Sequence, residues 1–459
     1  MRRFVVSLAL LAHSAAFVLA GPITPPPGPV ASTHKTLTEI EPRIAINATN
    51  TPGDGDSLYK ITQPGSYYLT GNITGVVGKH GIEIAASGVT LDLNGFDLVG
   101  VTGMGAFDGV NSLGIGFTNI TVMNGSIRNW GGDGLELATV GQQICRVQGV
   151  LASGNAGRGI AISSGSVAAC SALSNTGVGI EIGTAASVSG CVARANNGGG
   201  FLSADATSFV DCTAFQNQGA GFSCANACTF MRCISRGNLG SGFFGAAGCT
   251  LNDCSASANG GDGIRFTDAS SITHCTTLQN SLSGFKVDSA ATLAHCTARL
   301  NSLDGIVAAN ICVITECSVS ENNRRGIDVN FSSTITGCAA LANREDGIRT
   351  SSYCFILNNL TRANGAIADG AGVRVTGNAN RIEGNNMVQD GHVLDVGGDD
   401  NFIIRNTGQS LFGNDTRWFI VAGNAYGPIH RTSVGAAVNG ISAPTSPLNS
   451  TDPNANFSY

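Results

Sequence analysis

The sequence predicts an all-β solenoid, a right-handed parallel β-helix with about 21 residues and three short strands per coil. Three columns of residues that recur at one interval carry this prediction. Glycines recur every 21 residues: Gly179, Gly200, Gly221, Gly242, Gly263, Gly284, Gly305, Gly326 and Gly347. Cysteines recur in step with them: Cys170, Cys191, Cys212, Cys233, Cys254, Cys275, Cys296, Cys317 and Cys338. An asparagine follows each cysteine by five residues: Asn175, Asn196, Asn217, Asn238, Asn259, Asn280, Asn301, Asn322 and Asn343.

The pattern inside each repeat favours strands over helices. Apolar residues alternate over three or four positions and are then interrupted by Gly, Ser, Asn or Asp. The Leu-rich core of a leucine-rich repeat is missing from the sequence. The remaining solution is a coil of short strands in which each strand pairs with its equivalent one repeat on. Parallel crossovers of this kind are right-handed by strong default.

The polar columns indicate how the coils stack. Equivalent residues of successive coils lie about 4.8 Å apart, so stacked asparagines at a bend can hydrogen-bond from coil to coil and accept unusual backbone angles. Fourteen of the fifteen cysteines fall into two columns. Stacked Cβ atoms at that spacing are wider apart than the ~3.8 Å of a disulfide, so we expect mostly buried, free thiols. Cys224 lies outside both columns and is the expected exception, pairing with Cys228 or Cys249.

Residues 159–347 resemble the right-handed parallel β-helix repeat proteins of the pectate-lyase-like fold group. In that family the cysteine position is often a second asparagine. The segments PGSYYLTGNITG, GVTLDLNGFDL and ITVMNGSIRNWGGDG, with the closing ANFSY, also look like a group of exported bacterial β-helix proteins of unassigned activity. The resemblance implies the fold and no particular reaction, because fold does not fix function.

The ends of the chain differ from its repeats. Two arginines, an apolar stretch and small residues before Gly21 are typical of a secretory signal, with a single-span membrane anchor as the alternative. We therefore expect a secreted or cell-surface protein whose mature chain has no membrane span. The expected segments are a signal peptide (1–20), a Pro-rich linker (21–33), an N-terminal cap (34–80), the β-helix (81–410) and a C-terminal cap and tail (411–459). We expect about fifteen coils.

The candidate site is the outward row two residues after each repeat glycine, because catalytic β-helices place their chemistry on an outer strand face. Beside this row, one residue before the glycine, stand Asp304, Arg325 and Asp346. Basic and aromatic side chains that could bind the carboxylates and rings of a glycan are Phe244, Arg265, Lys286, Arg325 and Arg349. Acidic side chains that could serve as acid, base or calcium ligand are Asp304, Asp328 and Asp346. The alternative is a solvated face whose alternating charges only add to strand pairing.

These residues leave two functions open. The first is a non-catalytic extracellular or cell-surface element that binds glycans, such as an acidic polysaccharide, or other partners along one flank. The second is a polysaccharide lyase or hydrolase, since Asp304 and Asp346 stand two coils apart, roughly 9 to 10 Å, near the separation in inverting glycosidases. The motif set of polygalacturonases is missing, and the DPH-type sequence of alginate epimerases is not found.

Composition and the remaining motifs limit which partners and cofactors can be expected. A net charge of −6 without a basic cluster argues against a nucleic-acid partner. No cofactor is expected, except calcium if the protein is a lyase. No Cys or Cys/His set has the spacing of a metal site. His274 and His295 stack one coil apart and are expected to face solvent. The oligomeric state is not predicted.

Overall fold

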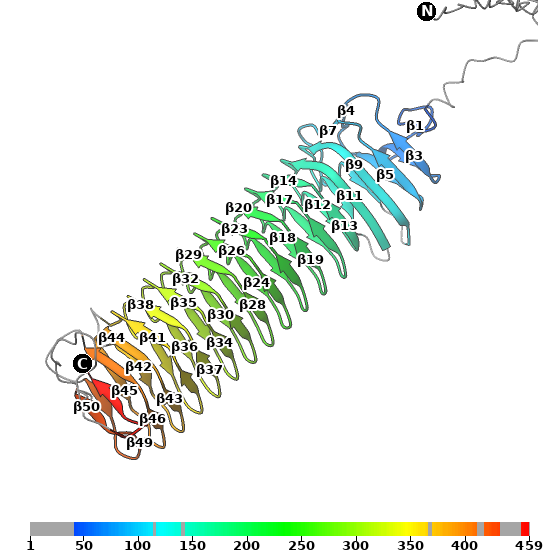
Figure 1. Ribbon diagram of the computed structural model, residues 1–459. Coiled ribbons are helices and arrows are strands. Elements are labelled where there is room, and N and C mark those ends of the chain that lie inside the picture. Colours follow the sequence, from blue (N-terminus) through cyan, green and yellow to red (C-terminus); the bar gives the residue numbers. More distant parts are fainter. Residues whose placement is uncertain are drawn as a thin grey trace, which may run out of the picture. The chain divides into compact units, whose positions relative to one another are not determined.

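The computed structural model describes residues 41–112, 116–138, 143–365, 370–410, 417–431 and 451–458. Residues Arg43–Tyr459 form one compact unit, and its described part is one stack of β coils (Figure 1). The predicted signal peptide and linker lie outside the described residues. In the described part of the chain no helix is long and apolar enough to span a membrane.

Every coil contributes strands to three parallel faces, which we call face 1, face 2 and face 3 (Figure 1). Face 1 consists of β2 (Ser57–Ile61), β5 (His80–Ile84), β8 (Val110–Asn111), β10 (Leu135–Leu137), β12 (Ile160–Ile162), β15 (Ile180–Ile182), β18 (Phe201–Ser203), β21 (Phe222–Cys224), β24 (Phe243–Gly245), β27 (Ile264–Phe266), β30 (Phe285–Val287), β33 (Ile306–Ala308), β36 (Ile327–Val329), β39 (Ile348–Thr350), β42 (Ala371–Val375), β45 (His392–Val396) and β48 (Trp418–Ile420).

Face 2 begins with β1, which precedes β2, and each of its later strands follows a face 1 strand along the chain. It consists of β1 (Ile44–Ala45), β3 (Gly65–Tyr68), β6 (Val89–Asp92), the first halves of β9 (Thr118–Arg128) and β11 (Gln143–Ser153), β13 (Gly165–Ala168), β16 (Ser187–Ser189), β19 (Ser208–Val210), β22 (Thr229–Met231), β25 (Thr250–Asn252), β28 (Ser271–Thr273), β31 (Thr292–Ala294), β34 (Val313–Thr315), β37 (Thr334–Thr336), β40 (Phe355–Leu357), β43 (Arg381–Glu383), β46 (Phe402–Ile404) and β49 (Ala425–Tyr426).

Face 3 completes each coil. It consists of β4 (Ile73–Thr74), β7 (Asp97–Val99), the second halves of β9 and β11, β14 (Ser171–Leu173), β17 (Val192–Arg194), β20 (Thr213–Phe215), β23 (Ile234–Arg236), β26 (Ser255–Ser257), β29 (Thr276–Leu278), β32 (Thr297–Arg299), β35 (Ser318–Ser320), β38 (Ala339–Leu341), β41 (Leu360–Arg362), β44 (Asn386–Asp390), β47 (Thr407–Ser410) and, at the end, β50 (Ile429–Arg431) and β51 (Asn456–Ser458).

The fold prediction is confirmed, with more coils than expected. Described strands pair in parallel with their equivalents one coil on, giving about 17 turns of about 21 residues where about fifteen were predicted. The stack begins earlier than residue 81, because β2 already pairs with β5. At the other end β51 pairs with β47 and β50, so part of the predicted tail joins the sheet.

Each coil has three bends, and at each bend a residue with a left-handed backbone angle is followed by a side chain that points into the core. In the coil after Gly263, the bends place Ala269, His274 and Gln279 at φ of 55°, 52° and 55°. The residue after each one is buried: Ser270, Cys275 and Asn280. The left-handed angle therefore falls on the residue before the asparagine, whereas the sequence analysis assigned it to the asparagine. The reason is that the asparagine side chain must turn inward to reach its neighbours.

The asparagine column forms the predicted ladder. Asn280 donates from its backbone N–H and from Nδ2 to Oδ1 of Asn301, at 3.1 and 3.0 Å, and the same pair of bonds repeats from coil to coil. The ladder runs from Asn155 to Asn364 and ends on a carboxylate, Asp390. Buried amides that are satisfied in this way hold successive coils in one register.

The cysteines are buried, free thiols inside the stack, as predicted for the two columns. The expected exception is not bonded either, since Cys224 Sγ lies 3.8 Å from Cys249 Sγ in a non-covalent contact. Burial raises the pKa of Cys312 and Cys354 above the ordinary range of a thiol. Deprotonated, reactive thiolates are thereby disfavoured at these two positions.

Candidate functional site

The outward row of face 1 runs the length of the stack in register. In the three-residue strands of face 1 the central side chain points away from the core while its two neighbours point inward. The paired central residues from β18 to β45 are Leu202, Ser223, Phe244, Arg265, Lys286, Val307, Asp328, Arg349, Arg374 and Asp395. Every predicted site residue therefore lies on this face or at the bend that leads into it.

Phe244, Arg265 and Lys286 occupy three successive rungs of that row. The Phe244 side chain is 42% exposed, and the Arg265 guanidinium carbon lies 5.8 Å from the centre of its ring, within cation–π range. Neither Arg265 nor Lys286 forms a salt bridge to any residue that the structure describes. This stretch, which we call the open stretch, combines an exposed ring with two cations free to bind a ligand.

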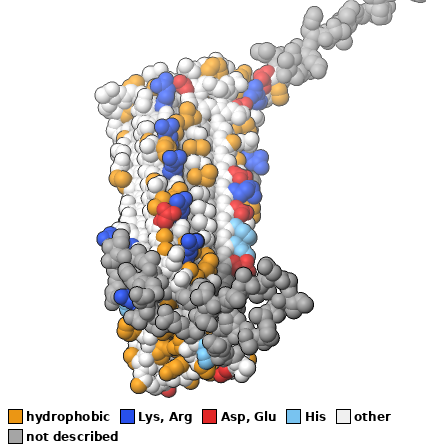
Figure 2. Space-filling model, turned by 60° about the vertical axis from the view of Figure 1, so that its left-hand side comes forward, with side chains coloured by type: hydrophobic (Ala, Val, Ile, Leu, Met, Phe, Trp, Pro, Cys, Tyr) orange, Lys and Arg blue, Asp and Glu red, His pale blue; other side chains and the backbone are white. Residues whose placement is uncertain are grey.

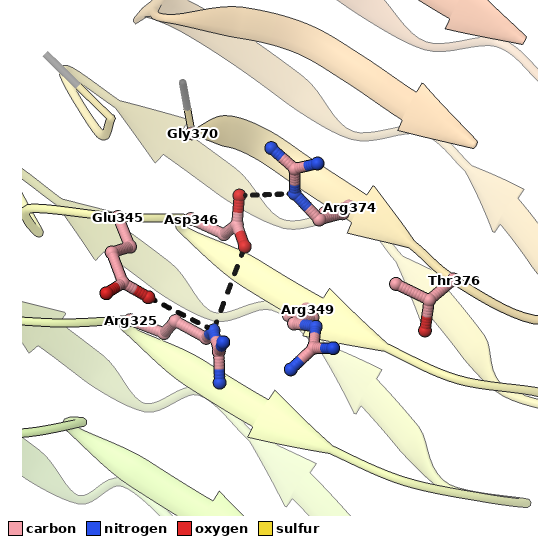
Figure 3. Close-up of a pocket in the computed structure, with 7 residues that line it drawn as sticks. All are labelled: Arg325, Glu345, Asp346, Arg349, Gly370, Arg374 and Thr376. Atoms are coloured by element: carbon pink, nitrogen blue, oxygen red, sulfur yellow. Dashed lines mark hydrogen bonds and ion pairs between the residues drawn. The ribbon is translucent and has the colours of Figure 1, made fainter. Parts of the chain in front are cut away.

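A hollow of about 380 Å³ lies further along the same face (Figure 3). It is lined by Arg325, Glu345, Asp346, Arg349, Gly370, Arg374 and Thr376. The Asp346 carboxylate lies between two arginines, 2.8 Å from Arg374 Nε and 3.8 Å from Arg325 Nε. Arg374 also pairs with Asp395, on the following rung. We call this group the paired cluster, because its charges are largely matched by one another.

Asp328 and Arg349, neighbours on the outward row, also belong to the paired cluster. Asp328 Oδ2 lies 2.8 Å from Arg325 Nη1, and Asp328 Oδ1 lies 3.9 Å from Arg349 Nη1. Arg325 is mostly buried, and its Nε forms no hydrogen bond within the described residues although Glu345 stands 3.4 Å away. The guanidinium of Arg349 is thus the one most weakly held by the protein in this group.

Asp304 and Asp346 are not on the solvent-facing row. They are only 3% and 5% exposed, and each accepts the backbone N–H of the next coil, Arg325 N at 3.1 Å and Ala371 N at 2.9 Å. Asp262 makes the same bond to Ser283 N, and Asp108 makes it to Asp133 N, well away from the cluster. An aspartate before the repeat glycine therefore serves in joining coils, which the sequence analysis did not foresee.

The carboxyl groups offer limited acid–base chemistry. Burial raises the pKa of Asp304, which is the direction a general acid needs, but Arg324 and a backbone amide already occupy its two oxygens. Among the described residues, three potential metal-ligand atoms converge at Asp54, Asp56 and Glu83 and not in the paired cluster. Catalytic roles for Asp304, Asp328 and Asp346, and calcium binding there, remain predictions.

Two further features, one on face 1 and one away from it, lie outside the predicted site residues. Arg374 and Asp395 extend the row. Arg374 stands two residues after Gly372, which follows Gly347 by 25 residues, so the sequence places it on the row although it was not among the predicted site residues. The histidine pair is found at the bend before face 3, with the rings of His274 and His295 stacked at 5.0 Å and His295 Nδ1 3.1 Å from Glu316.

Comparison with known proteins agrees with the fold. The family model for a right-handed β-helix region matches residues 141–282 and, overlapping, 243–364. The chain is therefore a right-handed parallel β-helix protein. A comparison with curated proteins gave no significant match.

Solved structures with the same kind of coil resemble the chain only distantly. The A-module of the mannuronan C-5 epimerase AlgE4 of Azotobacter vinelandii is 15% identical, with a TM-score of 0.31 over 79% of this chain and 90% of that one. The receptor-binding domain of the Siphovirus 9NA tailspike is 9% identical, with a TM-score of 0.26 over 83% and 75%. The periplasmic alginate epimerase AlgG is 11% identical, with a TM-score of 0.26 over 79% and 81%. Likeness at this level says nothing of activity.

Proposed function

We propose that this protein is an exported, non-catalytic element that binds an acidic polysaccharide along face 1, with the open stretch at the centre of the site. The observation that carries the proposal is the succession of Phe244, Arg265 and Lys286 on adjacent rungs, with both cations lacking a salt bridge among the described residues. A ring supplies a flat apolar surface for a sugar, and each cation supplies donors for a carboxylate.

The spacing of the rungs supports a polymer as ligand. Successive rungs are about 4.8 Å apart, and an extended pyranose unit is about as long as one rung spacing. Arg265 and Lys286 stand on neighbouring rungs, so they match a glycan with a carboxylate on each successive sugar, that is, a polyuronate. A long row with many weak contacts suits binding better than turnover.

The alternative of a lyase or hydrolase is less well supported. Its best acids, Asp304 and Asp346, already accept backbone amides and pair with arginines. Asp328 is more accessible, but two arginines stand beside it and no second free carboxylate faces it among the described residues. Cleavage chemistry would need these contacts to be exchanged for contacts with substrate.

The test is binding and cleavage measured side by side. Polygalacturonate should bind better than neutral dextran of the same length in isothermal titration calorimetry, and binding should weaken with salt, since exposed charges are screened over about 10 Å at 0.1 M. Phe244→Ser should weaken binding about fivefold or more by removing the sugar platform. Phe419→Ser, an exposed ring on the same face beyond Asp395, is the matched control and should change little.

Cleavage would contradict the proposal. New reducing ends, or the absorbance of unsaturated uronate, on incubation with pectin or alginate with or without calcium would identify an enzyme. Loss of that signal in Asp328→Asn would then place the chemistry in the paired cluster. Equal binding of charged and neutral glycans would equally reject the assignment of the open stretch.

A further inference from the structure

A second row of exposed cations lies on face 3, where the sequence analysis placed no site. The third residue of each short face 3 strand points outward, and from β17 to β41 this row contains Arg194, Arg236, Arg299 and Arg362. All four side chains are exposed. Figure 2 shows a face of the stack along which basic side chains follow one another with hydrophobic ones between them.

The centre of this row is a ring between two arginines. Phe215 pairs with Arg194 on one side and with Arg236 on the other, in successive strands. The Arg194 guanidinium carbon lies 5.4 Å from the centre of the Phe215 ring. The exposed side chain of Ile234 adds apolar surface beside Arg236. A cation, a ring and a second cation therefore stand in line on three rungs.

The surroundings leave Arg194 and Arg236 without acidic partners. Arg194 and Arg236 form no salt bridge with any described residue. From β14 to β41, the outward positions of face 3 and the bend residue after each strand hold a single acid, Glu321, which pairs with Arg299 at 2.8 Å. Four arginines against one glutamate make this row cationic on a chain whose net charge is −6, while the bend before face 3 carries the exposed acids Asp211, Asp253 and Glu316.

We propose that face 3 is a second glycan-binding surface, selective for a polysaccharide that carries one anionic group on every second sugar. Arg194 and Arg236 are two rungs apart, roughly 9.6 Å, with Phe215 on the rung between them. One sugar spans about one rung, so two acidic sugars meet the arginines while the uncharged sugar between them stacks on the ring. The open stretch differs, since its two cations stand on adjacent rungs.

The density of charge favours a polysaccharide over a nucleic acid. Arg194 and Arg362 are eight rungs apart, so four cations are spread over roughly 38 Å. Duplex DNA carries one charge per about 1.7 Å, far denser than this row, and the negative net charge of the chain would repel it. A sparsely charged glycan matches the row without leaving most of its charges unpaired.

The test compares two glycans and two double variants. Hyaluronan, with one carboxylate per disaccharide, and polygalacturonate, with one per sugar, are titrated into the parent, Arg194→Ser/Arg236→Ser and Arg265→Ser/Lys286→Ser. The face 3 variant should bind hyaluronan about tenfold more weakly and polygalacturonate within about twofold of the parent. The face 1 variant should do the reverse. Arg232→Ser is the control, because Arg232 is an exposed arginine outside the row and already pairs with Asp211; this variant should stay within about twofold of the parent for both glycans.

Each outcome separates this inference from the proposed function. The second surface is rejected if the parent does not bind hyaluronan, or if the face 3 variant binds hyaluronan as the parent does. Polygalacturonate binding on face 1 is tested separately, by the face 1 variant. Loss of hyaluronan binding in the face 1 variant, with binding kept in the face 3 variant, would place both ligands on face 1. Tighter binding of a single-stranded oligonucleotide than of hyaluronan would overturn the choice of ligand class. Unchanged circular dichroism melting of the exposed-site variants confirms that they remain folded.

Discussion

The open stretch and the paired cluster occupy one row of face 1, a few rungs apart, and use their charges differently. In the paired cluster, Asp346 accepts a backbone amide and contacts two arginines, so its charges hold successive coils together. In the open stretch, Arg265 and Lys286 follow an exposed ring and have no acidic partner among the described residues. Charged side chains on this face therefore differ in their partners: Asp346, at the bend, joins successive coils, whereas Arg265 and Lys286, on the outward row, are left available for the proposed ligand.

Removing Asp346 should have the largest effect on stability. Asp346→Ala leaves the buried Ala371 N–H without an acceptor and takes a close partner from Arg374, so it should lower the free energy of unfolding by about 2 to 4 kcal/mol. Urea unfolding followed by circular dichroism measures this. Asp328→Ala, which breaks ion pairs at a more accessible carboxylate, should cost less than half as much. Equal losses in both variants would show that the backbone bond is not what distinguishes them.

Asp390 is a buried carboxylate without a cationic partner among the described residues, in contrast to Asp346, which pairs with arginines. Asp390 ends the asparagine ladder, where Thr361 Oγ1 and the amides of Asn364 donate to it. Burial raises its pKa from 3.8 to about 6. The native state therefore binds this proton more tightly than the unfolded state, so the stabilisation is complete below about pH 4 and is lost as the pH rises through 6.

Asp390→Asn should remove that loss. At pH 8 the variant should be more stable than the parent by up to about 2 to 3 kcal/mol, because a neutral amide continues the ladder and no charge is buried. Near pH 4 the two proteins should unfold at the same urea concentration. Thermal or urea unfolding between pH 4 and 8 measures the difference. A variant that is less stable than the parent at pH 8 would mean that the carboxylate is favourably solvated by its donors.

The regular coils could be predicted in detail because each repeat is in contact with a copy of itself. The 21-residue period alone predicts that Asn280 and Asn301 stack in one column. It also predicts which residues of neighbouring coils pair. The ends were predicted less well. Single, unrepeated segments such as β2 and β51 give no period, so the sequence alone did not show that they join the stack.

The sequence predicted which strand positions the site residues occupy, but it did not predict which groups they contact. The sequence placed Phe244, Arg265 and Lys286 correctly on one outward row, because that follows from the period. It could not show that Asp304 and Asp346 turn inward, since the bend before the repeat glycine directs them to a backbone amide one coil on. The face 3 row was overlooked because its arginines recur at irregular multiples of the repeat.

The central claim is that paired charges hold the coils together whereas unpaired cations bind glycan, and one pair of double variants tests it most directly. Polygalacturonate affinity and urea unfolding are measured for Arg265→Ser/Lys286→Ser and for Arg325→Ser/Arg374→Ser. The first variant should lose binding about tenfold and unfold within about 0.5 kcal/mol of the parent. The second should lose about 2 kcal/mol or more of stability and keep its affinity within about threefold wherever it is folded. The reverse pattern, or loss of binding in the second variant alone, would contradict the account.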